Sequence, residues 1–145
     1  VRGLGETGLD YYRTEESQAA AQHVSFRAHI DIAREVGKPV IIHDRDAHKD
    51  VIETLETHGA PETVVFHCFS GDAEMAKICA QAGWYMSIPG VVTFKNAQQL
   101  RDAVLEIPDH LLLVETDSPF LTPAPNRGRQ IPQQTSLGQL EQFVR

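Results

Sequence analysis

Short, unbroken apolar runs recur along the chain, and longer stretches with a helical period separate them. The runs occupy residues 3–6, 39–43, 63–67, 84–88 and 111–117. Unbroken runs of this length, unlike runs that alternate apolar and polar residues, are typical of strands covered on both faces, as in a parallel sheet. The pattern therefore predicts five buried strands.

The stretches between these runs predict four helices. Each has apolar residues spaced three or four apart and a glycine or proline where the pattern stops. The predicted helices cover about residues 16–36, 47–58, 72–82 and 97–106. In the third stretch Asp72 and Glu74 fall in the first turn, where carboxylates interact favourably with the helix dipole.

Strands and helices alternate, and successive strands are about 20 to 30 residues apart, the length of one strand–helix unit. We therefore expect an α/β fold with parallel strands and right-handed crossovers. The Pro-rich stretch 122–132 predicts a loop, and the last residues, "LGQLEQFVR", are expected to begin a terminal helix. Residues 1–145 are expected to form a single domain.

Four of the five runs end in the same way, with an ionisable residue just before turn-forming residues. These residues are Glu6, His43, His67 and Asp117. Because the C-terminal ends of parallel strands meet at one edge, we expect the four side chains to converge. Two imidazoles and two carboxylates suit one or two divalent cations such as zinc or manganese. Such a cation would polarise a phosphoryl or carbonyl oxygen and lower the pKa of a bound water to about 7.

Each of these residues also has a purely structural explanation. A histidine after an apolar run is more often a hydrogen-bonded core residue than a metal ligand, and Glu6 and Asp117 both suit turns after strands. Repetition at four equivalent positions favours the metal site. Burying unpaired ionisable groups is costly, and metal coordination offsets that cost.

The last run, "LLLVETD", ends in two carboxylates, and strand alternation separates their roles. Leu113, Glu115 and Asp117 fall on one face, and Val114 and Thr116 on the other. If the first face carries the site, Asp117 lies at its rim and Glu115 about 6 to 7 Å deeper. We therefore predict that Asp117 binds the metal and that Glu115 supports the site through hydrogen bonds.

Other polar residues are weaker candidates. Arg45 follows His43 closely, although the first turn of a solvated helix is the favoured explanation for it. Arg127 lies in the last loop, where phosphate binding and simple solvation are equally plausible. Tyr11 could line the site or stack on a base. The remaining histidines lie in helical or loop patterns and are expected at the surface: His23, His29, His48, His58 and His110.

Composition narrows the classes of function. The chain has 145 residues and a formal net charge of -7, so any phosphate-binding surface must be local. No apolar run approaches the roughly 18 residues that cross a bilayer, and no signal-peptide pattern opens the chain. The two cysteines, Cys68 and Cys79, are too few for a disulfide framework, which fits a reducing compartment. We therefore expect a cytoplasmic protein without a membrane partner.

Four motifs, in this order and spacing, resemble those of the TatD-like metal-dependent deoxyribonucleases, TIM barrels of the amidohydrolase superfamily. The motifs are "GETGLDYYR" from residue 5, "VIIHDRDA" from residue 40, "VVFHCFSG" from residue 64 and "VETDSPFLTP" from residue 114, and the resemblance covers roughly residues 2–129. It implies one or two divalent metal ions, Mg, Mn or Zn. Their ligands would be Glu6, His43, His67 and Asp117.

The resemblance also implies an activity. It is the hydrolysis of phosphodiester bonds of DNA by a metal-activated water, in an exonuclease. Glu6 would bridge two metals, His43 and His67 would hold one, and Asp117 would bind the other. Asp117 would also take a proton from the attacking water, so Glu6 and Asp117 are the predicted catalytic residues. DNA is then the expected partner, with Arg45, Tyr11 and Arg127 as candidate substrate contacts.

Two departures from the family bear on how much of the barrel the chain contains. Family members carry a His-x-His motif in a first strand, and none occurs here, so the visible units would be the last five of a (βα)8 TIM-type barrel. Beyond Arg129, "QIPQQTS" differs from the family's Asn-x-Pro segment. We therefore expect a chain truncated at the N-terminus and also at the C-terminus. Two alternatives stay open: an amidohydrolase-type enzyme acting on another ester or amide, and an inactive truncated remnant.

Overall fold

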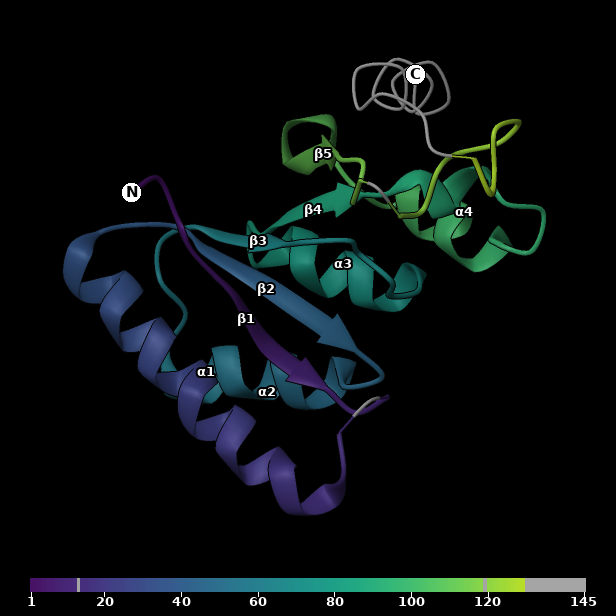
Figure 1. Ribbon diagram of the computed structural model, residues 1–145. Helices are drawn as coiled ribbons and strands as arrows, with labels where there is room; N and C mark the ends of the chain where they lie inside the picture. Colours follow the sequence, from purple (N-terminus) through teal and green to yellow (C-terminus); the bar gives the residue numbers. More distant parts are fainter. Residues whose placement is uncertain (13, 119, 130–145) are drawn as a thin grey trace. The chain divides into compact units, whose positions relative to one another are not determined.

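The structure is a computed structural model that describes residues 1–12, 14–118 and 120–129. The chain divides into two compact units, Val1–His67 and Cys68–Arg145. In both units parallel strands alternate with helices (Figure 1). The predicted α/β class with parallel strands is therefore confirmed, whereas a single domain over residues 1–145 stays a prediction.

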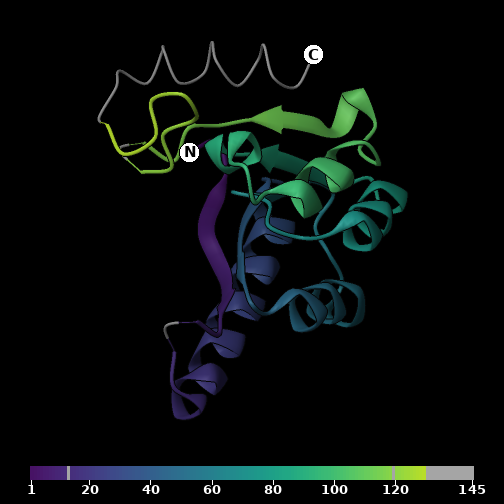
Figure 2. The same ribbon diagram turned by 90° about the vertical axis from the view of Figure 1, so that its right-hand side faces the viewer.

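The first unit is a parallel sheet with the strand order β1-β2-β3. Its strands are β1 (Leu4–Asp10), β2 (Val40–Arg45) and β3 (Val64–Phe66). Helix α1 (Glu16–Val36) connects β1 to β2, and α2 (His48–His58) connects β2 to β3. Both helices pack against the strands, and the long α1 runs beside β1 in both views (Figures 1 and 2).

The buried stripe of α1 is the one that its spacing predicts. Phe26, Ile30 and Ala33 are all 0% exposed, and Leu9 of β1 and Ile42 of β2 are equally buried in the same unit. Burying a large apolar side chain stabilises a fold by roughly 1.5–3 kcal/mol. This helix–sheet core therefore fixes the strands that carry the candidate site.

The second unit repeats the strand–helix alternation on a smaller scale. Its elements, in order, are α3 (Ala73–Gln81), β4 (Tyr85–Ile88), the 3-10 helix η1 (Gly90–Thr93), α4 (Gln98–Val104), the 3-10 helix η2 (Asp109–Leu111) and β5 (Leu112–Val114). Strands β4 and β5 pair in parallel. At the start of α3 the Asp72 carboxylate accepts a 2.9 Å hydrogen bond from the backbone N–H of Met75, which caps the helix.

Strand β1 is longer than predicted. It continues to Asp10 instead of ending at Glu6, because Thr7 and Leu9 point into the core at alternate positions. Polar residues and glycines interrupt the apolar run after Leu4, so a prediction based on apolar residues alone misses the second half of the strand. Glu6 therefore lies inside a strand and not at its end.

Strand β5 is shorter than predicted. It ends at Val114, although the backbone N–H of Glu115 still donates a 3.1 Å hydrogen bond to the Ile88 carbonyl of β4. Asp117 has a φ of 46°, in the left-handed region. The alternation of a strand therefore does not extend to Asp117, and it cannot place Asp117 on the same face as Glu115.

Residues 122–129 lie outside helices and strands, as the loop predicted over 122–132 requires, and residues 130–132 lie outside the described residues. The terminal helix expected beyond them lies outside the described residues. Cys68 is half-buried and Cys79 is buried. Among the described residues, no helix combines the length and the apolar character that crossing a bilayer requires, and the cytoplasmic location stays a prediction.

A hydrogen-bond network ties the end of β1 to both helices of the first unit. The Tyr11 hydroxyl donates to Oδ2 of Asp50 at 2.5 Å and lies 2.9 Å from Nε2 of His23. Burial, and then the Asp50 carboxylate, raise the pKa of Tyr11 to about 12, because both disfavour the phenolate. His23, expected as a plain surface residue, instead has one ring nitrogen engaged in this network.

Replacing Ile30 with alanine is expected to lower the free energy of unfolding by about 2–5 kcal/mol, because the deletion leaves a cavity in the core. The matched control is Ile32→Ala on the same helix, where the side chain is 44% exposed. That change is expected to stay within about 0.5 kcal/mol of the wild type. Urea denaturation at fixed pH measures both, and equal losses would contradict the assigned buried face of α1.

Tyr11 is expected to lose its proton at a higher pH than an ordinary tyrosine does. Because its pKa in the folded state is raised from 10.0 to about 12, its stabilising effect is complete below pH 10 and is lost as the pH rises towards 12. Absorbance at the tyrosinate wavelength should show one late ionisation that disappears in Tyr11→Phe and persists in the neighbouring control Tyr12→Phe. A late ionisation that survives Tyr11→Phe would show that the network is assigned wrongly.

Candidate metal-binding site

Three of the four predicted ligands lie together in the first unit. Nδ1 of His43 is 2.5 Å from Oε1 of Glu6, and Nε2 of His67 is 3.7 Å from Oε2 of Glu6. The Glu6 carboxylate therefore lies between the two imidazoles, with one oxygen towards each ring. The side chains of Glu6, His43 and His67 are 49%, 32% and 24% exposed, so the cluster is open to solvent.

The register of the sheet places the two histidines at the same level. Ile42 of β2 pairs with Phe66 of β3, and each histidine is the next residue along its chain. The ladder continues past the end of β3, because the backbone N–H of His67 donates to the Ile42 carbonyl at 2.9 Å. Parallel neighbours at equal levels bring their side chains to one face, as the pattern of strand ends predicts.

A bulge in β1 accounts for the position of Glu6. The pairing with β2 shifts between Leu4 and Thr7, so that Gly5 and Glu6 together oppose the single residue Ile41. A bulge changes the direction in which a side chain leaves the strand and is frequent beside functional sites. It lets the Glu6 carboxylate reach the imidazoles although Glu6 is not at the strand end.

Gly8 allows β1 to pass close to His43. These two residues are register partners, and a Cβ atom at Gly8, whose φ is 149°, would overlap the carbonyl oxygen of His43. An L-residue here would be strained as well as blocked. The close approach of the two strands at this point therefore depends on glycine.

Asp10 is absent from the predicted site residues, yet it belongs to the cluster. Its Oδ2 lies 3.1 Å from Nε2 of His43, so His43 has a carboxylate at each ring nitrogen. The signal was present in the sequence: positions 6, 8 and 10 share one face of an extended strand. The backbone N–H of Asp10 donates to Oε1 of Gln22 on α1 at 2.8 Å, which fixes this end of β1.

A cavity of about 480 Å³ opens beside Glu6, Asp10 and His43. The other described residues that line it are Thr7, Gly8, Ala21, Gln22 and Ser25, all from β1 and α1. Small-molecule sites usually occupy about 300–1,000 Å³. Glu6, Asp10 and His43 therefore face a space large enough for a cation with its water ligands and part of a substrate.

The donor atoms fit a divalent cation in their chemistry. Two ligands of one tetrahedral zinc ion are roughly 3.3 Å apart, given bonds of about 2.0–2.2 Å. The His67–Glu6 separation of 3.7 Å is close to this value, whereas the His43–Glu6 separation of 2.5 Å is that of a direct hydrogen bond. Metal binding therefore requires His43 and Glu6 to move apart by about 1 Å, with the cation in place of the shared proton. In agreement, no group of three or more His, Cys, Asp and Glu side chains in the described part of the chain forms a ready-made metal site.

The fourth predicted ligand, Asp117, belongs to the second unit. It follows β5, and its carbonyl accepts a 2.9 Å hydrogen bond from the backbone N–H of Phe120. Oε1 of Glu115 is shielded from solvent. The roles assigned to these two carboxylates, metal ligand for Asp117 and support for Glu115, stay predictions.

The candidate substrate contacts are all engaged in local interactions. The Arg45 guanidinium lies 3.9 Å from the centroid of the Tyr12 ring, and Arg45 belongs to β2 and not to the first turn of a helix. The Arg127 guanidinium lies 4.2 Å from the Phe94 centroid in the second unit. Stacking of this kind uses the face of the guanidinium and leaves its N–H groups available. The Tyr11 hydroxyl, by contrast, is already bonded, and substrate contact by all three residues stays a prediction.

Curated proteins of similar sequence are named as metal-dependent hydrolases. The chain is 49% identical over 132 residues to the "Uncharacterized metal-dependent hydrolase TatD" of Mycobacterium tuberculosis, covering 88% of this chain and 50% of that protein. It is 50% identical over 131 residues to the "Uncharacterized metal-dependent hydrolase YcfH" of Escherichia coli K12, covering 90% of this chain and 49% of that protein. The chain thus spans about half the length of these relatives.

Solved structures agree on the fold. The crystal structure of YJJV, a TatD homolog from Escherichia coli, matches with a TM-score of 0.89 at 28% identity, covering 99% of this chain and 55% of that chain. A TatD family hydrolase from Entamoeba histolytica matches with a TM-score of 0.74 at 25% identity, covering 88% of this chain and 42% of that chain. The predicted fold, five strand–helix units of a TIM-type barrel, is therefore confirmed.

A family model described as "TatD related DNase" matches residues 1–144. The match extends across both units and includes all four motifs that the sequence carries. The chain therefore belongs to the TatD-related DNase family.

Proposed function

We propose that this chain carries the metal ligands of a metal-dependent hydrolase that cleaves phosphodiester bonds of DNA with an activated water, as an exonuclease. The observation that supports this most is the Glu6 carboxylate between His43 and His67 in a chain of the TatD-related DNase family. Because the chain spans about half the length of its curated relatives, the activity is proposed for the whole protein.

Each proposed ligand has its own role in binding one or two cations. Glu6 presents a separate oxygen to each imidazole, which is the arrangement that a bridging carboxylate needs. His43 and His67 supply neutral nitrogen donors, and Asp117 completes the set and accepts a proton from the attacking water. When bound, a divalent cation (Mg, Mn or Zn) would polarise a phosphoryl oxygen and lower the pKa of a bound water to about 7.

Asp10 is proposed as a positioning residue for His43. A neutral imidazole has one N–H, and donating it to a carboxylate leaves the other nitrogen free to bind metal. The 3.1 Å contact between Nε2 of His43 and Oδ2 of Asp10 suits this role, with Nδ1 directed towards Glu6 and the cation. Asp10 would therefore set both the tautomer and the orientation of the ring.

DNA hydrolysis is tested with the full-length protein and an end-labelled oligonucleotide, with Mn²⁺ or with excess EDTA. Chelation should abolish cleavage, and added metal should restore it. His67→Ala should lower kcat/KM by about 100-fold or more, since it removes a ligand. The matched control is His29→Ala, an imidazole on α1 whose Nδ1 lies within hydrogen-bond distance of the Ser25 carbonyl and hydroxyl in the same helix.

Three outcomes would contradict the proposal. Cleavage that survives both EDTA and His67→Ala would exclude the metal mechanism. Metal-dependent hydrolysis of model esters or amides without any cleavage of DNA would favour the amidohydrolase-type alternative, and the absence of every activity would favour an inactive remnant.

Asp10→Asn is expected to weaken Mn²⁺ binding by about 10- to 100-fold, because it removes the charge that orients His43. Isothermal titration calorimetry measures the affinity directly. Asp31→Asn is a matched control, since Oδ1 of Asp31 lies 2.9 Å from Nε2 of His58 in the same unit but on other elements. An affinity equal to that of the wild type in Asp10→Asn would remove Asp10 from the site.

A further inference from the structure

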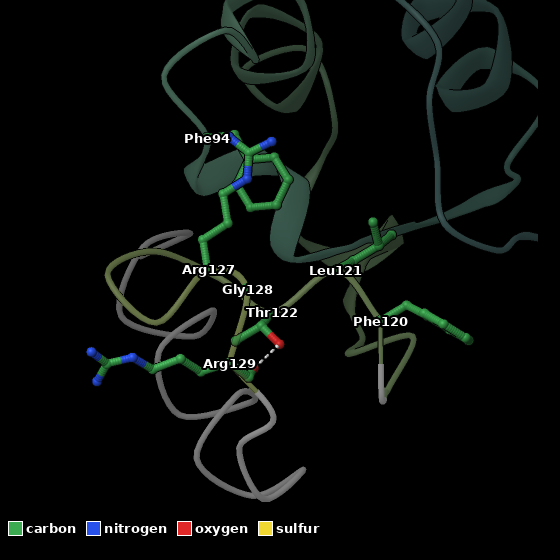
Figure 3. A pocket seen from close by; sticks show the side chains of 7 residues that line it. All are labelled: Phe94, Phe120, Leu121, Thr122, Arg127, Gly128 and Arg129. Carbon is green, nitrogen blue, oxygen red and sulfur yellow. Dashed lines mark hydrogen bonds between the residues drawn. The ribbon is translucent and has the colours of Figure 1, made fainter.

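A second cavity, of about 380 Å³, lies entirely within the second unit (Figure 3). The described residues that line it are Phe94, Phe120, Leu121, Thr122, Arg127, Gly128 and Arg129. They include two arginines and two phenylalanines, and none of them is acidic. In a chain with a formal net charge of -7, this is a local concentration of positive charge next to aromatic surface.

The loop that carries both arginines is closed by its own hydrogen bonds. The hydroxyl of the buried Thr122 donates to the Arg129 carbonyl at 2.8 Å. The backbone N–H of Arg129 donates to the Asn126 carbonyl, and that of Asn126 donates to the Pro123 carbonyl, both at 3.0 Å. The positions from which Arg127 and Arg129 extend are therefore fixed before any ligand arrives.

The loop is also anchored to η1. The backbone N–H of Ala124 donates to Oγ1 of Thr93 at 2.7 Å. A Cβ atom at Gly90 would overlap the carbonyl oxygen of Leu121, so only glycine allows the two backbones to come this close. Anchoring of this kind lowers the entropy cost of binding, because the loop is already ordered.

The arginine side chains are arranged to contact phosphates. Arg127 stacks its guanidinium on Phe94, with 4.2 Å between the guanidinium carbon and the ring centroid, and its N–H edges stay available for a planar, bidentate contact. Arg129 is exposed and extends from the other side of the loop (Figure 3). Because the guanidinium groups of Arg127 and Arg129 point in different directions, they suit two successive phosphates of a strand better than one isolated phosphate.

Phe120 supplies an aromatic platform at the same site. Its side chain is 71% exposed and extends away from the loop into solvent (Figure 3). Exposing a large apolar ring is unfavourable unless a partner covers it, and nucleic-acid bases stack on such rings with little dependence on sequence. The backbone hydrogen bond from Phe120 to the Asp117 carbonyl links this platform directly to a proposed metal ligand.

We propose that residues 120–129, together with Phe94, form a binding site for single-stranded nucleic acid. Arg127 and Arg129 contact phosphates of the strand, and a base stacks on Phe120. The inference rests on the proposed function, since it names the part of the chain that holds the DNA strand. It would place positive charge for a polyanion in a chain whose formal net charge is -7.

The test measures binding without hydrolysis. Fluorescence anisotropy of a labelled oligothymidylate is followed in EDTA over a range of salt concentrations, with the full-length protein and single variants. Arg127→Ala and Arg129→Ala should each weaken binding and lower the slope of log affinity against log salt by about 0.7. Phe120→Ala should weaken binding about five-fold or more and leave that slope unchanged.

The controls separate the local site from overall charge and from misfolding. Lys38→Ala removes one exposed cation from the first unit and should leave affinity and slope near those of the wild type. Arg129→Lys keeps the charge and should restore most of the slope. Thermal unfolding of each variant shows whether the loop change has altered the fold.

Affinity and salt slope within about two-fold of the wild type in all three pocket variants would overturn the inference. Competition by inorganic phosphate or thymidine monophosphate as effective as that by the unlabelled oligomer would overturn it as well. Binding that depends on these residues, without cleavage when metal is added, would support the site and contradict the proposed hydrolysis. If the pocket variants bind the oligonucleotide as tightly as the wild type and still cleave it when metal is added, the proposed hydrolysis is supported and this binding site is contradicted.

Discussion

The parallel pairing of β2 with both β1 and β3 is the constraint on which the candidate metal site depends. It sets His43 level with His67 and brings β1 close enough for Gly8 to lie against the His43 backbone. A shift of one residue in either pairing would turn a histidine to the opposite face of the sheet, towards the helices. The buried stripe of α1 holds this register, because it packs on the strands that carry the site.

Within that register, the carboxylates determine what the histidines can do. Glu6 lies in a bulge and its carboxylate reaches both imidazoles. The Asp10 carboxylate contacts Nε2 of His43, the ring nitrogen that does not face Glu6. A cation that replaces the proton between His43 and Glu6 would need these two side chains to move apart by about 1 Å, beside a cavity that both of them line. Within the second unit, Asp117 and the anchored, arginine-bearing loop follow one another along the chain.

The sequence alone was enough to predict the order of strands and helices and the convergence of Glu6, His43 and His67, but not the ends of β1 and β5, because apolar runs and helical stripes are local signals. What it could not predict depends on partner strands and on backbone geometry. The bulge at Glu6 arises only from the pairing of β1 with β2 around Ile41. The left-handed φ of Asp117 ends the strand-like alternation of faces that the sequence pattern predicts for Glu115 and Asp117. The network of Tyr11 joins the residue that follows β1 to His23 of α1 and Asp50 of α2, and their spacing in the sequence carries no signal.

A crystal structure of the full-length protein with Mn²⁺, recorded with anomalous scattering, would show whether Glu6, His43 and His67 bind a divalent cation. If they do, an anomalous peak is expected about 2.0–2.3 Å from a Glu6 oxygen and from one nitrogen of each histidine, with His43 and Glu6 farther apart than the present 2.5 Å. Peaks only at other places, with His43 still hydrogen-bonded directly to Glu6 at saturating metal, would contradict this metal site.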